Sequence, residues 1–345
     1  LHLDRCLTCR NCETTCPSGV QYGHLIDIGR QVVEAKVPRP PAEARKRRLL
    51  KEGLTSPLFG TALRLGQSVR GLLPAVLKDK VPERRAAGAW PRRAHPHKVL
   101  LLEGCVQPAM APNINAATAR VLDAAGIECV LPRGQGCCGA VRYHLADGEG
   151  GLKQMRANID AWWPHIERGA VEAIVINASG CGAMVKDYGH LLRHEPRYAD
   201  RAAKVSELAR DLSELLPYLA EALQGRVRPP AAVLGWHAPC TLQHGMQLRG
   251  GVEQYLGALG FQLRPAAQEA HLCCGSAGTY SVLQPELATK LRDRKLGHLL
   301  GDKASERPAA VLSANIGCIT HLQSGTEVPV RHWIEVLDEA LVASK

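Results

Sequence analysis

Residues 99–108 read VLLLEGCVQP, and residues 232–240 read AVLGWHAPC. These two similar strings open a series of segments that occurs twice in the same order. The later segments are GIECVLP (126–132) and GFQLRPA (260–266), GCCGA (136–140) and LCCGSAG (272–278), and AIVINASGCGAM (173–184) and AAVLSANIGCITH (309–321). Self-similarity of this kind is the signature of a duplicated structural unit.

The cysteines stay in register with the repeat. They pair as Cys105 with Cys240, Cys137 with Cys273, Cys138 with Cys274 and Cys181 with Cys318, at offsets of 135, 136, 136 and 137 residues. Chance does not easily place four cysteines in this way, so we predict that each half uses them at a metal centre. Two alternatives stay open: buried structural cysteines in both halves, and ligands retained in only one half.

Short runs of Val, Leu and Ile alternate with helical patterns in both halves, such as those at 113–125 and 251–259. Such runs fit strands that are buried on both faces of a parallel sheet. We therefore predict an α/β fold with two tandem repeated cysteine-rich domains, at 99–225 and 226–345. Because ligands bind beyond the carboxyl ends of strands in such sheets, the cysteines that follow the strands can converge there.

A third cysteine cluster lies at the N-terminus. CLTCRNCETTCP (6–17) has the ligand spacing of bacterial ferredoxins, in which closely spaced thiolates hold a [4Fe-4S] cluster. We predict a small helical ferredoxin-like segment at 1–35 with ligands Cys6, Cys9, Cys12 and Cys16. In two-cluster ferredoxins the fourth cysteine serves the other cluster, so Cys16 either closes this cluster or binds a neighbour. A zinc site is the alternative, although zinc sites favour two separate CxxC pairs.

The repeats are predicted to hold one or two further clusters. The cofactor-binding residues expected there are Cys105, Cys137, Cys138, Cys181, Cys240, Cys273, Cys274 and Cys318, of which the last four are also expected to bind metal directly. Histidines near these cysteines are His144, His237, His244 and His321. We retain His321 as an extra ligand because it follows Cys318 by three residues. Cys129 has no counterpart in the second half and is expected in the core.

Bulk composition limits the function. The 345-residue chain carries a net charge of +10, and sixteen Lys or Arg against four acids lie between Lys36 and Lys98. We predict a basic helical connector at 36–98 that favours an acidic partner or an anionic membrane surface. Within it, apolar residues from Leu58 to Val76 recur at helical spacing and fit a helix packed on its own protein, on a partner or on a membrane. With aromatic residues at only 4 %, nucleic acid is not an expected partner.

The sequence has no apolar run of transmembrane length and no signal peptide pattern, so the cytoplasm is the expected location. Thirteen cysteines in such a chain indicate metal ligands rather than disulfides. The chain also has no GxGxxG fingerprint, phosphate loop or Ser-His-Asp pattern in a suitable context. A flavin or nicotinamide site is therefore expected on another chain.

At its paired Cys-Cys-Gly motifs and its N-terminal motif, the sequence resembles the cysteine-rich CCG-repeat family. That family includes the cysteine-rich subunit of heterodisulfide reductase, the anaerobic glycerol-3-phosphate dehydrogenase iron-sulfur subunit and the lactate-utilisation proteins. The strings LHLDRCLTCRNCETTCPSGV (1–20), WHAPCTLQHG (236–245) and HLCCGSAGTYSVLQPELA (271–288) look more specifically like the iron-sulfur subunits of bacterial glycolate oxidases. The resemblance covers essentially the whole chain.

The resemblance implies an electron-transfer subunit that is not catalytic alone. Such a subunit accepts electrons from FAD-containing oxidase subunits and passes them toward a membrane or quinone-linked acceptor, with a peripheral position at the inner face of the cell membrane. The alternative from the wider family is a catalytic subunit that reduces a disulfide or another small substrate at a CCG-bound cluster.

Two departures from the family pattern bear on the ligands. Glycolate oxidase iron-sulfur subunits carry two ferredoxin motifs and this chain shows one, so we expect a second motif upstream of Leu1. Heterodisulfide reductase repeats end in CxxC, whereas these end in Cys181-Gly-Ala-Met184 and Cys318-Ile-Thr-His321. A noncubane cluster of that type is therefore not expected, and a four-thiolate cubane or one completed by His321 remains open.

Overall fold

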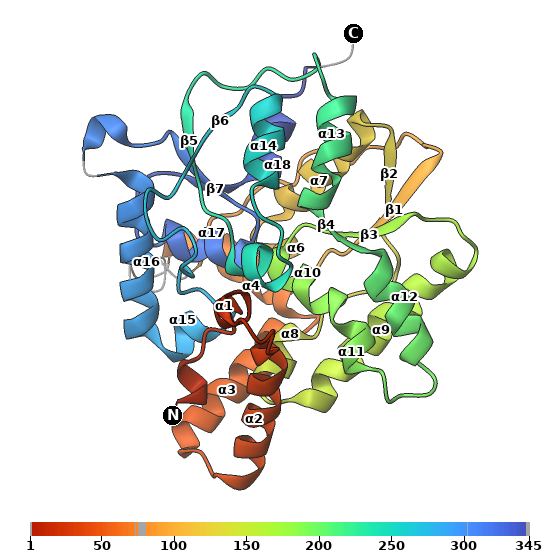
Figure 1. Cartoon of the computed structure of the whole chain (residues 1–345), viewed down its shortest axis with the longest axis vertical. Helices are drawn as coiled ribbons and strands as arrows, with labels where there is room; N and C mark the ends of the chain where they lie inside the picture. The colour runs from red at the N-terminus through yellow and green to blue at the C-terminus, as the bar shows by residue number, and fades with distance from the viewer. Residues whose placement is uncertain (1, 73, 75–80, 302, 343–345) are drawn as a thin grey trace.

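A computed structural model describes residues 2–72, 74, 81–301 and 303–342. Within these ranges eight strands form two four-stranded sheets, in the orders β2-β1-β3-β4 and β6-β5-β7-β8, and every neighbouring pair is parallel. The strands are β1 (His97–Leu101), β2 (Ile127–Val130), β3 (Ala173–Ile176), β4 (Ala209–Asp211), β5 (Val233–Trp236), β6 (Gln262–Pro265), β7 (Ala310–Ser313) and β8 (Val330–His332). The predicted fold class, two repeated α/β units with parallel sheets, is confirmed (Figure 1).

Helices connect the strands and also form the N-terminal segment. The N-terminal elements are η1 (Leu3–Arg5), α1 (Asn11–Thr15), α2 (Tyr22–Lys36), α3 (Pro41–Leu54), α4 (Phe59–Ser68) and η2 (Arg70–Leu72). The first unit contains α6 (Gln107–Met110), α7 (Pro112–Ala124), α8 (Ala140–His144), α9 (Gly148–Glu167), α10 (Ser179–Lys186), α11 (Tyr188–Leu191), α12 (Ala199–Leu208), η3 (Leu212–Leu215) and α13 (Leu216–Ala222). The second contains η4 (Thr241–Gly245), α14 (Gly251–Ala258), α15 (Tyr280–Leu283), α16 (Pro285–Leu300), η5 (Ala304–Glu306), α17 (Ile316–Gln323) and α18 (Trp333–Glu339). The domain boundaries drawn from the sequence stay predictions.

Alternate side chains of β1 pack on opposite faces of the first sheet, as the two-residue period of a strand requires. Val99 and Leu101 join one apolar cluster with α7 and α13. Leu100 and Leu102 join a second cluster with α9, α10 and α12. Because both faces are covered, a continuous Val-Leu-Leu-Leu run is stable here, and each fully buried Leu contributes about 1.5 to 3 kcal/mol.

The two units share one core through reciprocal helix contacts. Helix α7, which follows the first strand of its unit, packs on α18, which follows the last strand of the other unit. In the same way α14 packs on α13, and the four helices lie together in the upper half of Figure 1. Their apolar faces belong to a single cluster that includes residues of both sheets. The repeats are therefore joined by an interface in which each unit contributes the same pair of helices.

An unexpected fourth strand in each unit ends in a matching helix cap. The Asp211 carboxylate accepts the Ser213 amide, and Glu214 accepts the Asp211 amide. His332 and Glu335 form the same reciprocal cap at the start of α18. These strands are only three residues long, so no periodicity could reveal them.

The N-terminal segment is tied together by a buried arginine. Arg30 of α2 donates to the carbonyl oxygens of Leu3 and Cys6, at 3.2 and 2.7 Å, and to the Thr8 hydroxyl at 2.8 Å. The loop that carries Cys6 is thereby fixed to a helix outside the cysteine motif. In Figure 1 this segment occupies the lower part of the molecule, with α1 above α2 and nearer the sheets.

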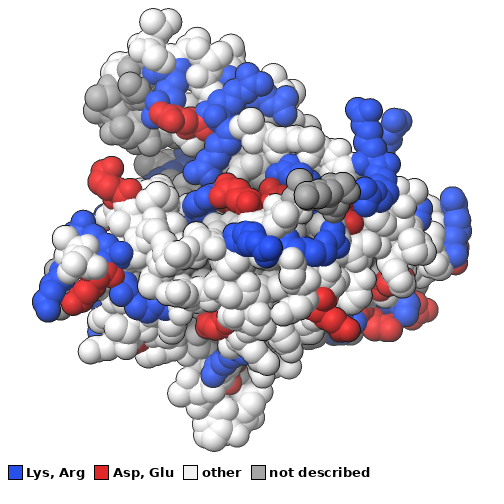
Figure 2. Space-filling model, turned by 90° about the horizontal axis from the view of Figure 1, so that it is seen from above, with Lys and Arg blue, Asp and Glu red and all other residues white. Residues whose placement is uncertain are grey.

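Part of the positive charge predicted for the connector is used within the protein. Arg39 and Arg47 both donate to the Asp4 carboxylate, and Arg39 also contacts Glu34. Burial raises the pKa of Asp4, but the two arginines outweigh it and the net shift is downward. On the face seen in Figure 2, Lys and Arg occur in separate groups with Asp and Glu among them rather than as one continuous surface.

The apolar helix predicted from Leu58 is shorter than its sequence pattern. Helix α4 ends at Ser68, η2 follows, and Val76 lies outside the described residues. The helix packs on α6 of the first unit, while Leu58, Leu65 and Leu72 stay exposed at 70 %, 68 % and 87 %. Among the described helices none is both long enough and apolar enough to cross a membrane.

Candidate metal centres

Four cysteines of the second unit meet at the carboxyl end of its sheet, as predicted for cysteines that follow strands. Cys240 precedes η4, Cys273 and Cys274 lie in the loop after β6, and Cys318 lies in the first turn of α17. All four are buried, and the Cys240 and Cys273 sulfurs are 3.7 Å apart. We call this group the second centre.

The electrostatics of the second centre favour thiolates that share their charge. Hydrogen bonds from Cys240 and then Cys274 lower the pKa of Cys273. Contact with Cys274 lowers the pKa of Cys318 to about 5, with a smaller contribution from His237. A mutually contacting set of buried thiols without any disulfide fits the donor set of an iron-sulfur cluster.

A buried cation accompanies these thiols. Lys295 of α16 is 2 % exposed, and its ammonium group donates to the Glu269 carbonyl oxygen at 2.6 Å. Burial lowers its pKa, while Cys274 and Cys273 oppose that shift. A buried positive charge that interacts with Cys274 and Cys273 would offset the negative charge of a thiolate-bound cluster.

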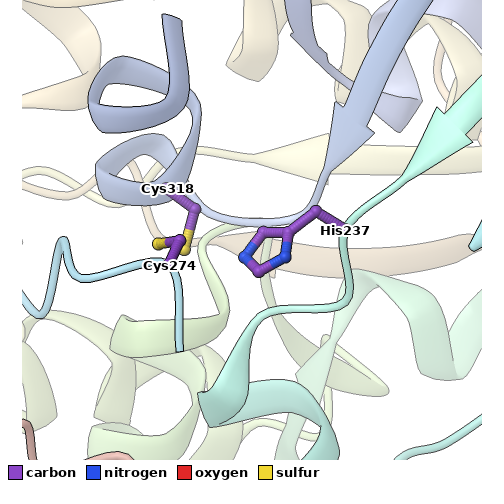
Figure 3. A group of neighbouring side chains, drawn as sticks. All are labelled: His237, Cys274 and Cys318. Carbon is purple, nitrogen blue, oxygen red and sulfur yellow. The ribbon is translucent and has the colours of Figure 1, made fainter. Parts of the chain in front are cut away.

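His237 also faces the second centre. Figure 3 shows one ring nitrogen of His237 turned toward the sulfurs of Cys274 and Cys318. The three donor atoms lie within 4.8 Å of one another, and all three residues are buried. Neither ring nitrogen of His237 has a nitrogen or oxygen hydrogen-bond partner among the described residues.

The first unit holds an equivalent group, the first centre, made of Cys105, Cys137, Cys138 and Cys181. Hydrogen bonding from Cys105 lowers the pKa of Cys137 to about 3. The pKa of Cys138 is raised by its contacts with Cys137 and Cys181. The four cysteines are therefore linked in sequence by side-chain contacts, as in the second centre.

The glycine after each cysteine pair is required by the backbone. Gly139 and Gly275 have φ values of +92° and +90°, which side chains rarely adopt. A Cβ atom on Gly275 would lie 2.5 Å from the Ala288 carbonyl oxygen, and one on Gly139 would lie 2.9 Å from the Gly151 carbonyl oxygen. The cysteine loop thus rests directly on the backbone of α9 in the first unit and of α16 in the second.

Buried polar side chains hold the other loops of the first centre. Asn177 donates to Asn115 and to Thr118, both at 2.9 Å, and its oxygen accepts from Gln107 at 2.7 Å. In the second unit Asn315, the N-cap residue of α17, lies with its side-chain nitrogen 3.7 Å from the Cys318 sulfur. An asparagine near the start of each cysteine-bearing helix therefore shapes the loop around the sulfurs.

The N-terminal motif lies against the second centre. Burial raises the pKa of Cys9 to about 11, and Cys273 is the cysteine with the largest further influence, ahead of Cys6 and Cys12. Thr8 and Arg10, on either side of Cys9, both have positive φ, at 52° and 59°. Such strain in residues other than glycine persists only where the surroundings enforce it, and it gathers at functional sites.

Polar contacts fix this arrangement. The Thr14 hydroxyl of α1 lies 2.9 Å from His244 Nδ1, and His244 Nε2 lies 2.9 Å from the carbonyl oxygen of His271. The Tyr280 hydroxyl donates to the Arg5 carbonyl oxygen at 3.2 Å. The loops that carry Cys240 and Cys273 therefore hold the N-terminal motif from two sides.

Cys16 has a different environment from the other three N-terminal cysteines. Backbone amides, with that of Val20 foremost, lower the pKa of Cys16. Its sulfur also accepts from the Tyr22 hydroxyl at 3.8 Å. A half-buried thiol whose pKa is lowered suits either of the roles predicted for Cys16, and both stay predictions.

The other candidates are placed as follows. The His321 ring lies 3.1 Å from the Ala288 carbonyl oxygen, so it already has a partner, and its role as a ligand stays a prediction. Cys129 lies in β2 at the edge of the core, where burial raises its pKa to about 12. The three-residue spacing from Cys318 favours His321 as a ligand over His237. A signal for His237 is nevertheless present, because WHAPC in the second unit has a histidine where LLEGC in the first unit has a leucine.

Comparison with known proteins finds the same duplication. The cysteine-rich domain family matches residues 99–186 and 234–323, once in each unit. The chain is 51 % identical to the glycolate oxidase iron-sulfur subunit of Escherichia coli (strain K12), over 99 % of this chain and 82 % of that protein. The chain belongs to the glycolate oxidase iron-sulfur subunit family.

The chain is also similar to more distant relatives. The probable glycolate oxidase iron-sulfur subunit of Bacillus subtilis (strain 168) is 30 % identical over 94 % of this chain and 78 % of its own length. Lactate utilization protein A of Geobacillus thermodenitrificans (strain NG80-2) is 30 % identical over 70 % of this chain and 98 % of its own length. Membership in the glycolate oxidase iron-sulfur subunit family makes the chain a component of an oxidoreductase complex with iron-sulfur clusters.

Proposed function

We propose that this chain is the electron-transfer subunit of an enzyme complex that oxidises glycolate or a related 2-hydroxy acid. The observation that carries the proposal is the packing of α1, in the ferredoxin-like motif, on η4, which directly follows Cys240 of the second centre. Two ligand sets held against each other in this way suit a relay between one-electron carriers. The carbon chemistry then belongs to FAD-containing partner subunits, and this chain is not catalytic alone.

The residues fit [4Fe-4S] clusters as cofactors. Cys6, Cys9 and Cys12 would hold one ferredoxin-type cluster, with Cys16 as its fourth ligand or as a ligand of a neighbouring cluster. The two cysteine groups of the repeats would hold one or two more. When bound, such clusters supply reversible one-electron redox chemistry.

The chain's own residues prepare these sites. Burial of all four sulfurs in the second centre excludes water from them, and Lys295 supplies a compensating charge. The apolar cluster around Cys274 and Cys318 belongs to the main core, so this centre is built into the rigid part of the fold. Electron carriers benefit from such rigidity because little reorganisation then accompanies a change of charge.

We further propose that electrons leave toward a membrane or quinone-linked acceptor, with the protein attached peripherally to the inner membrane face. Helix α4 and η2 present Leu65 and Leu72 to solvent, and the exposed Arg64 directly precedes Leu65. Apolar side chains beside a cation suit an anionic lipid surface. Such attachment should weaken with salt, and sedimentation with anionic vesicles that is equal at about 50 mM and about 500 mM salt would contradict it.

The proposal can be tested on the purified protein under anaerobic conditions. Iron and acid-labile sulfide analysis with EPR should reveal clusters in the wild type and the selective loss of one signal in Cys273→Ser. On mixing with FAD-containing subunits reduced by glycolate, the wild type should be reduced and Cys273→Ser should be reduced more slowly or less completely. Cys129→Ala serves as the control because Cys129 lies outside all three cysteine groups.

Two results would overturn the proposal. A colourless protein with zinc in place of iron would exclude electron transfer. Turnover of a disulfide by the isolated chain, without flavin subunits, would favour a catalytic subunit of the heterodisulfide reductase kind.

A further inference from the structure

The two centres differ at one structurally equivalent position. The amide of His237 donates to the Leu312 carbonyl oxygen at 2.9 Å, and the amide of Leu102 donates to the Val175 carbonyl oxygen at 3.0 Å. Each residue directly follows the first strand of its unit, and each accepting residue lies in the neighbouring strand. The offset of 135 between Leu102 and His237 is also that between Cys105 and Cys240.

In the first unit this position is simply part of the core. Leu102 is 2 % exposed and packs in the same apolar cluster as Cys138. In the second unit the same backbone position brings His237 to Cys274, the counterpart of Cys138. Because the fold accepts an aliphatic side chain here, packing alone does not require an imidazole.

The imidazole is also costly where it lies. His237 is 1 % exposed, and neither ring nitrogen meets a nitrogen or oxygen partner in the part of the chain that the structure describes. A buried polar group without a nitrogen or oxygen partner destabilises the fold, and coordination of a metal by the ring would offset that cost. Every other buried histidine in the described residues has its ring engaged: His244 by Thr14 and a backbone carbonyl, and His332 by two backbone groups.

We propose that His237 is a metal ligand in the second centre, where it binds beside Cys274 and Cys318 and makes that centre chemically unlike the first. This inference rests on the proposed function, in that it takes the second centre to hold an iron-sulfur cluster. The neutral imidazole donates a nitrogen lone pair to iron, so no proton or electron is exchanged when it binds. The ring nitrogen that faces the sulfurs supplies that lone pair (Figure 3).

The surroundings can satisfy the rest of the ring. His237 also lines a cavity of about 100 Å³ together with Arg249 and Glu253. This volume suffices for a few water molecules. A histidine ligand ordinarily donates its second ring N–H to a carboxylate, a carbonyl or a water, and a hydrated cavity provides such a partner.

A histidine ligand has a direct consequence for electron flow. A neutral nitrogen donor leaves the cluster less negative than thiolates alone would, which raises its reduction potential. Lys295 acts in the same direction in the second centre. The second centre is therefore expected to be reduced before the first. Because α1 of the N-terminal motif packs on η4 of the second unit, electrons from that motif have the better acceptor beside them.

The test is pulsed EPR on the reduced, cluster-containing full chain labelled with ¹⁵N-histidine. The wild type should show a histidine nitrogen coupling to one cluster, and the coupling should change on labelling. His237→Leu, which copies the first unit, should lose the coupling and lower the potential of that cluster. His237→Cys supplies a thiolate at the same position, so it should retain iron while losing the coupling, and it keeps the test valid if the leucine variant folds poorly.

His321→Gln is the matched control, because His321 lies in the same unit three residues from Cys318. It should keep the nitrogen coupling. A coupling that survives His237→Cys, or that disappears in His321→Gln, would overturn the inference. If the clusters relay electrons but show no histidine coupling, the inference about His237 is wrong and the proposed function still holds. If the coupling is intact but the flavin subunits transfer no electrons to this chain, only the proposed function is wrong.

Discussion

Replacement of His332 by Asn should change the pH dependence of stability in a direction that the structure fixes. The His332 ring lies at the interface of the two units, where Nε2–H donates to the Asn177 carbonyl oxygen at 2.9 Å and Nδ1 accepts the Ile334 amide at 3.1 Å. The contact with Ile334 requires the neutral ring, because a protonated imidazole has no lone pair at Nδ1. Burial lowers the pKa of His332 from 6.5 to about 3, although the Asn177 contact opposes the shift.

The size of the effect follows from linkage. A histidine whose folded pKa is lowered contributes stability that is complete above the unfolded pKa of 6.5 and is lost as the pH falls toward 3. Between pH 7 and pH 5 the unfolded chain takes up the proton and the folded chain does not, which costs about 2 kcal/mol. Asn retains the N-cap but loses the bond to Asn177, at a pH-independent cost of about 1 to 2 kcal/mol.

Urea unfolding of wild type and His332→Asn at pH 7, 6 and 5 measures the difference. The wild type should be more stable at pH 7, and its advantage should shrink by about 2 kcal/mol at pH 5 and vanish or reverse. The wild type must be compared with the variant because Asp211 also makes stability depend on pH. Burial raises the pKa of Asp211 to about 6, so its contribution changes with pH in the opposite direction to that of His332, and it is the same in both proteins. The exposed His97→Asn is the control. A wild-type advantage that stays constant from pH 7 to pH 5 would refute the reasoning.

Three further predictions concern the cysteine sites. Gly275→Ala should remove iron from the second centre and destabilise the fold by several kcal/mol in thermal unfolding, because it combines a positive φ with a backbone clash. The control Gly257→Ala has open space around the new Cβ atom, so it should be neutral or slightly stabilising. Cys129→Ala should leave the iron content unchanged. In the wild type, alkylation at pH 8 followed by mass spectrometry should find Cys129 unmodified, because burial raises its pKa to about 12. Labelling of Cys129 at the rate of a free thiol would contradict this prediction. Asp187→Asn should break the ion pair with Arg10, lower the free energy of unfolding by about 1 to 3 kcal/mol and make the N-terminal EPR signal disappear faster in air. Unchanged air sensitivity would argue against a role for this pair.

The repeat and the parallel sheet type could be predicted because both follow from local sequence patterns. The Val-Leu-Leu-Leu run at 99–102 needs a sheet buried on both faces, and it has one. The convergence of Cys240 with Cys273 and Cys274 followed from the rule that ligands gather at the carboxyl ends of parallel strands. Helix positions were within a few residues, as at 113–125 against Pro112–Ala124.

What the sequence did not reveal depends on contacts between distant residues. Cys9 and Cys273 are 264 positions apart, and nothing in either motif indicates that they approach each other. Helical spacing from Cys318 favours His321 over His237. Spacing does not account for the Ala288 carbonyl oxygen, which the His321 ring contacts instead, or for the strand end that directs His237 toward the sulfurs.

The reciprocal packing of α7 and α18 has a consequence for the synthesis of the protein. Helix α7 ends at Ala124 and its partner begins at Trp333, so about two hundred residues must be translated before the apolar face of α7 is covered. At about 5 to 20 residues per second, that interval lasts roughly 10 to 40 s. During this time the first unit exposes a surface prone to aggregation, and the loop with Cys318 emerges near its end. Protection of this surface during synthesis should therefore favour folding, and the second centre has its full set of cysteines only after Cys318 has been translated.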